Sequence, residues 1–174
     1  MLFLPSAFIW AQIGSAQSQV NIIISQVHTI QVSQPSVSID MSDISHYISG
    51  SSSGQQTDHV KVVSSSAYQV TVKSATQYFS LNGGATTLPV NTIAVNTTTG
   101  SDLTGTNAQP PAGLVVTPQV QLSTTAATIV NSPEGEWGRG YNVNYSIPQA
   151  MTPNYMNRDN GTYTTTVTYT LVPQ

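Results

Sequence analysis

Ionisable side chains, which acid–base or metal chemistry requires, are sparse in this chain. Charged residues make up 6% of the sequence, whereas soluble domains average about 25%. The chain has no cysteine, so disulfides, thiolate nucleophiles and cysteine-ligated zinc are excluded. Only four residues are Lys or Arg, which is too few for the basic surface that binds nucleic acid. We therefore expect no nucleic-acid partner.

The histidines and nearby acids are the first candidates for a metal site. His46 and His59, together with Asp43 and Asp58, would have to converge from different segments, because no His-x-His or His-x-x-x-His spacing occurs. The stretch 50–54 (GSSSG) spells Gly-x-Ser-x-Gly, but it belongs to a Ser-rich loop and not to the strand-to-helix turn of a nucleophile elbow, so hydrolase chemistry has no local signature. The sequence thus predicts no catalytic residue, no metal and no cofactor, and it favours a protein that is not an enzyme.

The segment 132–140 is the second candidate and reads as a turn-rich loop. Glu134 and Glu136 could form a carboxylate pair or a calcium corner, although a solvated turn is the simpler interpretation. Trp137 with Tyr141 forms a candidate ligand loop, because an exposed aromatic ring can stack on a sugar. In the competing interpretation Trp137 folds onto the core.

The C-terminal stretch carries the clearest structural signal. Residues from Tyr163 to Val172 alternate without a break, which predicts one long β-strand with an apolar face and a hydroxyl face. Pro173 ends this strand because it lacks a backbone N–H. The predicted apolar face consists of Tyr163, Thr165, Val167, Tyr169 and Leu171.

The N-terminal stretch 18–32 contains neither Gly nor Pro and also reads as a strand. Val20, Ile22 and Ile24 share one face, and Val27 falls on the other. At about 3.3 Å per residue the stretch would extend close to 50 Å, which is too long for one strand of a small domain. Either it bends and switches between two sheets, or its first half leaves the domain.

Short strands with turn signals between them fill the rest of the chain. We expect a single helical turn over 42–50 with Ile44, Tyr47 and Ile48 on one side, and a hairpin turn at 82–84. The expected strands cover 36–41, 58–64, 67–74, 86–90, 92–97, 114–116, 119–123, 127–131 and 141–147, and residues 78–81 lead into the hairpin turn. This pattern, with no helix of ten residues, predicts an all-β fold: an antiparallel β-sandwich, immunoglobulin-like, with an extended N-terminal strand.

The expected organisation has three parts. Residues 1–17 are either a signal peptide, because an apolar run of suitable length precedes small residues, or an N-terminal extension. Residues 18–32 form the N-terminal strand, which is either a donor to another subunit or a sheet-switching strand. Residues 33–174 form the β-sandwich domain.

Both terminal strands lack the devices that protect sheet edges. Neither 18–32 nor 163–172 contains Lys, Arg, Asp or Glu, and soluble monomers usually guard edges with such charges. A donated strand that completes a neighbour's sheet would build a head-to-tail homo-oligomeric filament. The donor residues would be Val20, Ile22, Ile24 and Val27, and the acceptor edge would be Tyr163, Thr165, Val167, Tyr169 and Leu171. The alternative is that both strands pair with each other inside one sandwich.

Three segments carry a resemblance to a known family: VNIIISQVHTIQV (20–32), DHVKVVSSSAYQVTVKS (58–74) and YTTTVTYTLV (163–172). With them the chain resembles the cysteine-free, immunoglobulin-like fimbrial or surface-fibre subunits of Bacteroidetes-type bacteria. The resemblance implies a secreted pilus subunit in a cell-surface filament, assembled by strand donation with the help of a periplasmic chaperone. It also implies that the mature protein has no membrane span.

Two other classes of function stay open at this point. One is a monomeric carbohydrate-binding or adhesin module that uses Trp137 and Tyr141. The other is a viral or phage structural β-sandwich, which would form closed shells or trimers.

Overall fold

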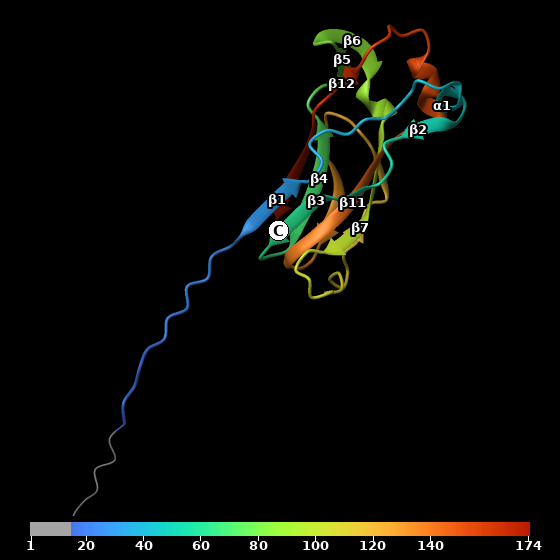
Figure 1. The fold of residues 1–174 in the computed structure, drawn as a ribbon. Coiled ribbons are helices and arrows are strands. Elements are labelled where there is room, and N and C mark those ends of the chain that lie inside the picture. The colour runs from blue at the N-terminus through green and yellow to red at the C-terminus, as the bar shows by residue number, and fades with distance from the viewer. Residues whose placement is uncertain (1–14) are drawn as a thin grey trace, which may run out of the picture.

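A computed structural model describes residues 15–174, which fold into an antiparallel β-sandwich (Figure 1). Within this range the strands form three sheets, and the two larger sheets pack against each other. The predicted all-β sandwich is therefore confirmed. The expected signal peptide or extension, residues 1–17, lies almost wholly outside the described residues.

The first sheet has the strand order β1-β3-β11-β7-β9, and β2 pairs with one end of β11. All of its pairings are antiparallel. Its strands are β1 (His28–Val32), β2 (Gly50–Ser52), β3 (Gln56–Ser64), β7 (Ala94–Asp102), β9 (Gln119–Gln121) and β11 (Glu136–Pro148).

The second sheet has the order β13-β4-β10-β8, and the small third sheet has the order β12-β5-β6. The strands of the second sheet are β4 (Tyr68–Ser74), β8 (Val115–Val116), β10 (Ala127–Ser132) and β13 (Val167–Pro173). Those of the third are β5 (Tyr78–Leu81), β6 (Gly84–Pro89) and β12 (Tyr163–Thr164). The third sheet lies with the short helix α1 (Ile44–Ser49) and β2 at the end of the sandwich far from the N-terminal segment (Figure 1).

The core lies between the two larger sheets and is built by the period of two that the sequence shows. Val60 and Val62 of β3 are buried, and so are Val70 and Val72 of β4 on the facing sheet. The Ser-rich turn 65–67 carries the chain from one sheet to the other. β11 contributes every second side chain from Tyr141 to Ile147, and Ile129 and Val130 of β10 are both buried, so one apolar layer holds both sheets together.

The helical segments are short: α1 (Ile44–Ser49), η1 (Val90–Thr92) and η2 (Gln149–Tyr155). The predicted turn is α1, which Asp43 caps by accepting a hydrogen bond from Ser45 N. As predicted, the helix places Ile44, Tyr47 and Ile48 on one side, but Ile44 and Ile48 are exposed and only Tyr47 of the three is half-buried. No helix in the described part of the chain has the length and apolar character needed to cross a membrane.

Two predicted elements, the strand 36–41 and the loop 132–140, are wrong. Residues 36–41 form no strand, although Val37, Ile39 and Met41 do pack on the core as the alternation predicts. The predicted loop 132–140 is mostly strand, because β11 already begins at Glu136. A pattern of alternation reports which side chains face the core, but a strand also needs a neighbouring strand to bond.

The predicted single strand 163–172 is split between two sheets. Tyr163 in β12 pairs with Leu81 of β5, whereas β13 pairs with β4. Between them Thr165 leaves the ladder and its hydroxyl lies 2.8 Å from that of Ser74. The predicted alternation of burial is nevertheless confirmed, since odd-numbered side chains from 163 to 171 are half-buried and even-numbered ones are exposed.

Ile129→Ala is expected to lower the free energy of unfolding by about 2–5 kcal/mol, because Ile129 is fully buried between the sheets and its removal leaves a cavity. Urea denaturation measures this loss. The matched control is Ile48→Ala, whose side chain is 62% exposed and whose loss should stay within about 0.5 kcal/mol. Equal losses for both variants would contradict the assignment of the core.

Candidate functional site

The N-terminal arm, residues 15–27, forms neither helix nor strand and runs away from the sandwich (Figure 1). Its apolar side chains lie in solvent: Val20 is 82% exposed, Ile22 81% and Ile24 89%. Of the predicted strand 18–32, only His28–Val32 is strand. The first half therefore leaves the domain, and the sheet-switching alternative is wrong.

The base of the arm is fixed to the turn that follows β3. Ser65 N donates to Val27 O over 2.9 Å, and Val27 N donates to Ser65 Oγ over 2.8 Å. His28 Nδ1 lies 2.9 Å from Ser64 Oγ. The arm thus leaves the sandwich from a defined point and in the direction of β1.

The apolar face of the arm continues the core-facing side of β1. His28 and Ile30 are the half-buried residues of β1, and Ile30 packs on the core. Val20, Ile22 and Ile24 are also even-numbered, so they share this face wherever the chain stays extended. The arm therefore has the side-chain pattern of a core strand but no sandwich of its own to cover it.

Among residues 15–174, β13 forms one edge of the second sheet and pairs only with β4. Ala75 N donates to Thr166 O, and Gln174 N donates to Ala67 O, so even-numbered residues of this segment exchange their backbone bonds with β4. In an antiparallel ladder the residues between them point the other way. The backbone N–H and C=O groups of Val167, Tyr169 and Leu171 consequently point away from β4, and no strand of the described residues pairs with them; we call this row the open edge.

Tyr163 and Thr165 do not belong to the open edge, contrary to the predicted acceptor. Tyr163 lies in the third sheet, and Thr165 lies between the strands. The predicted pairing of the two terminal strands inside one sandwich is also wrong, because β1 bonds β3 and β13 bonds β4. The two strands lie side by side as edges of different sheets.

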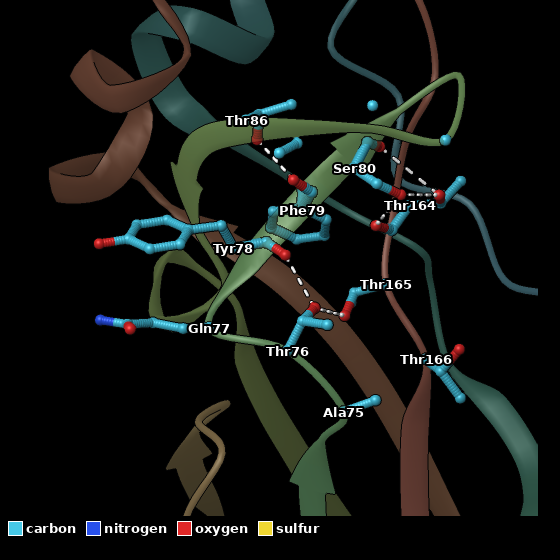
Figure 2. Close-up of a pocket in the computed structure, with 13 residues that line it drawn as sticks. Ala75, Thr76, Gln77, Tyr78, Phe79, Ser80, Thr86, Thr164, Thr165 and Thr166 are labelled. Carbon is cyan, nitrogen blue, oxygen red and sulfur yellow. Dashed lines mark hydrogen bonds between the residues drawn. The ribbon is translucent and has the colours of Figure 1, made fainter.

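A shallow hollow lies where the open edge begins (Figure 2). Its volume is about 480 Å³, and its lining comes from residues 75–80, 83–86 and 164–166. Hydroxyl groups line part of it: Thr76 Oγ1 donates to Tyr78 O, and Ser80 Oγ lies 3.0 Å from Thr164 Oγ1. No lining residue is charged, and apolar atoms make up more of the exposed lining than polar atoms, so the hollow is neutral and of mixed character.

The predicted ligand loop is not assembled. Trp137 is 76% exposed, so the alternative in which it folds onto the core is wrong. Tyr141 is fully buried on the other side of the strand, with its hydroxyl 2.6 Å from that of Tyr68. Glu134 is exposed and Glu136 buried, so the two acids do not form a pair.

A buried polar cluster lies between the sheets and was not predicted from the sequence. Glu136 accepts from Arg139 Nε over 2.7 Å and from the Tyr68 hydroxyl over 2.7 Å. Arg139 also donates to Ala108 O over 3.0 Å. Burial first, and then the neighbouring Tyr141, raise the pKa of Tyr68 well above its ordinary value. Because every member is partnered, the cluster links β4, β11 and the loop 103–113 rather than offering a reactive group.

Three of the candidate metal ligands, Asp43, Asp58 and His59, each bond a different partner. Asp43 caps α1, Asp58 accepts from Ser101 N, and His59 is buried with Gln34 Oε1 at 2.8 Å and Tyr145 Oη at 3.1 Å. Tyr145 in turn contacts the Tyr169 hydroxyl at 2.6 Å, which extends this chain of bonds to β13. Among residues 15–174 no three His, Cys, Asp or Glu side chains lie close enough to hold a metal ion.

Comparison with known proteins adds no functional indication, since no protein-family model and no curated protein matches the chain.

The stability of the fold should fall as the pH drops below about 6.5, because burial lowers the pKa of His59. Between the pKa of His59 in the unfolded chain and its lower pKa in the folded chain, only the unfolded chain binds the proton. The free energy of unfolding therefore decreases by up to about 1.4 kcal/mol per pH unit as the pH falls through this range. Urea denaturation at pH 7, 6 and 5 measures the slope. His59→Gln should flatten it, and an unchanged slope in that variant would assign the effect to another group.

Proposed function

We propose that the protein is a structural subunit of an extracellular filament, in which the N-terminal arm of each copy adds as a strand to the open edge of the next. The observation that carries this proposal is that one chain has both an exposed apolar arm and an open sheet edge. In the part of the chain that the structure describes, the apolar face of the arm packs on no core, and β13 has backbone groups that pair with no strand. Each supplies what the other lacks.

The lack of charge on both surfaces supports assembly rather than protection. Between residues 15 and 32 and along β13 there is no Lys, Arg, Asp or Glu, although such residues are the usual means of preventing edge pairing. β13 also has no bulge in its register with β4, so its open edge is regular. A regular, uncharged edge next to an exposed apolar arm favours strand addition.

The energetics require backbone bonds as well as apolar burial. Ordering about ten residues costs about 10–20 kcal/mol in backbone entropy. Burying Val20, Ile22 and Ile24 returns roughly 5–9 kcal/mol, and six backbone hydrogen bonds add about 3–9 kcal/mol. The gain approaches the cost only when the arm bonds along the whole open edge, which favours a continuous strand over a loose hydrophobic contact.

The arm is expected to reach a neighbour rather than its own chain. To lie along its own β13 it would have to reverse direction at its fixed base, and residues 15–34 contain no Gly or Pro for such a turn. Contacts in which one copy gives an arm and the next receives it are head-to-tail, and they propagate into fibres when they do not close.

The immunoglobulin-like topology, secretion to the cell surface and assistance by a periplasmic chaperone belong to the same proposal. They come from the resemblance of 20–32, 58–74 and 163–172 to fimbrial subunits. An exposed apolar arm and an open edge are surfaces that would aggregate before assembly. Such surfaces would need a chaperone until the neighbouring subunit arrives.

Replacing Val20, Ile22 and Ile24 together by serine should abolish assembly, and deleting residues 17–25 should do the same. Both variants should remain folded, since these side chains make no contact with the core. Negative-stain electron microscopy and light scattering distinguish fibres from monomers, and far-UV circular dichroism checks the fold.

The matched control replaces Gln19, Asn21 and Ser25 by alanine, on the opposite face of the arm. This variant keeps the apolar face and should still assemble. Fibres from the deletion variant, or a wild-type chain that stays monomeric at all concentrations, would contradict the proposal.

A further inference from the structure

We infer that the incoming arm lies antiparallel to β13 in one register, in which three apolar side chains of the arm stand opposite three half-buried side chains of the edge. The register consists of the pairs Val20–Leu171, Ile22–Tyr169 and Ile24–Val167. This inference rests on the proposed function, because its partner is a second copy of the chain bound at the same open edge.

The direction follows from the end of the sandwich at which the arm begins. Val27 bonds Ser65 and Gln174 bonds Ala67, so the base of the arm and the end of β13 meet at the same turn. Figure 1 shows the C-terminal end beside the start of β1. β13 therefore runs toward this end, whereas the arm enters β1 from it and β1 runs away.

In a head-to-tail filament all copies have the same orientation, so the arm reaches the next copy at its far end. There its chain runs opposite to β13, and the pairing is antiparallel. Antiparallel pairs are also slightly more stable per residue than parallel ones. The chain direction of the arm and the direction of β13 thus both favour antiparallel pairing.

The register follows from the fact that the free backbone groups of the open edge belong to odd-numbered residues of β13. Its free N–H and C=O groups belong to Val167, Tyr169 and Leu171, and each must face an arm residue that exchanges both bonds with it. Residues directly opposite each other place their side chains on the same face. Since the three edge side chains point toward the core, the three opposite arm residues must be apolar.

Only the even-numbered residues of the arm meet this condition. The odd-numbered ones would turn Asn21 and Ser25 toward the core. A slip of two residues in either direction would place Gln26 opposite Val167 or Ser18 opposite Leu171. The register with Val20, Ile22 and Ile24 is the one that fills all three positions.

The start of the open edge carries the hydroxyl groups of Thr164, Thr165 and Thr166, which fit the polar residues that follow in the arm. An arm entering from the far end crosses residues 164–166 before it reaches Val167 (Figure 2). Ser25 and Gln26 of the arm lie at this crossing. Their side chains would meet hydroxyl groups and no charge.

Cysteine pairs test the register, and the chain has no native cysteine to interfere. On the exposed face of β13 the register places Ile23 opposite Thr168 and Asn21 opposite Thr170. These are non-hydrogen-bonded pairs with Cα atoms about 4.5 Å apart, within the range that a disulfide spans. Single variants I23C and T168C, or N21C and T170C, are mixed as full-length chains, assembled and mildly oxidised. Non-reducing gels should show a covalent dimer in both mixtures.

The swapped mixtures, I23C with T170C and N21C with T168C, use the same four cysteines. In the inferred register these are diagonal neighbours about 7–8 Å apart, so they should link at least about tenfold more slowly. Each single variant oxidised alone shows the background from chance collisions.

Faster linking in a swapped mixture would overturn the register by showing a slip of two residues. Fibres without links in any mixture would show that the arm binds a different edge: assembly through the arm would stand, but both the register and the open edge as its acceptor would be overturned. A disulfide-linked monomer of the double variant I23C/T168C, with no dimer in the mixtures, would show that the arm binds its own chain. A mixture that remains monomeric would overturn both the proposed function and the register.

Discussion

The pairing of backbone hydrogen-bonding groups is the constraint on which the rest of this structure depends. With so few charged side chains, the protein has little means of stabilising or protecting a surface except through its strands and hydroxyl groups. Each strand therefore has to find a neighbour, and the chain divides its short strands among three sheets to provide them. Where no neighbour exists, as along the outer side of β13, the backbone groups remain available to another chain.

Two buried polar chains give the apolar core a defined arrangement. One joins Arg139, Glu136 and Tyr68 across β11 and β4, and the other joins Gln34, His59, Tyr145 and Tyr169 across β3, β11 and β13. Burial raises the pKa of Tyr145 to about 12 and that of Tyr169 further, so both hydroxyls keep their protons at ordinary pH. Since buried polar groups are costly when unpaired, these chains fix how β13 sits against the first sheet. The hydrogen bonds that end at Tyr169 thereby hold the open edge against the first sheet.

Much of the fold could be predicted from the sequence because its information is local. Alternation identified the core-facing residues of β3, β4 and β13 correctly, and Asp43 with Gly50 marked the ends of α1. The pairing of each strand with its neighbour, in contrast, depends on residues that are far apart in the sequence. The pattern at Val37, Ile39 and Met41 gives a face but cannot reveal that no strand lies beside it. Likewise, nothing between Tyr163 and Val172 indicates a change of sheet at Thr165.

The candidate site was predicted in part for the same reason. The length of 18–32 predicts either a strand that switches sheets or an arm that leaves the domain, and it cannot decide between them. The direction of the backbone groups of Val167, Tyr169 and Leu171 depends on the register with β4, which the sequence does not reveal. The start of β11 was hidden by glycines that resemble a loop. Gly140 is required inside the strand, because the carboxylate of Asp58 from β3 occupies the place where a Cβ would lie. Such a requirement comes from a residue far away in sequence and leaves no local signal.

The straight passage from the arm into β1 has a mechanical consequence. A force that pulls on the arm acts along β1, while the backbone bonds between β1 and β3 run across that direction. The load is therefore shared by all of these bonds at once, in shear, instead of opening them one after another from an end. A chain built in this way would yield under tension only when the whole of β1 slides past β3.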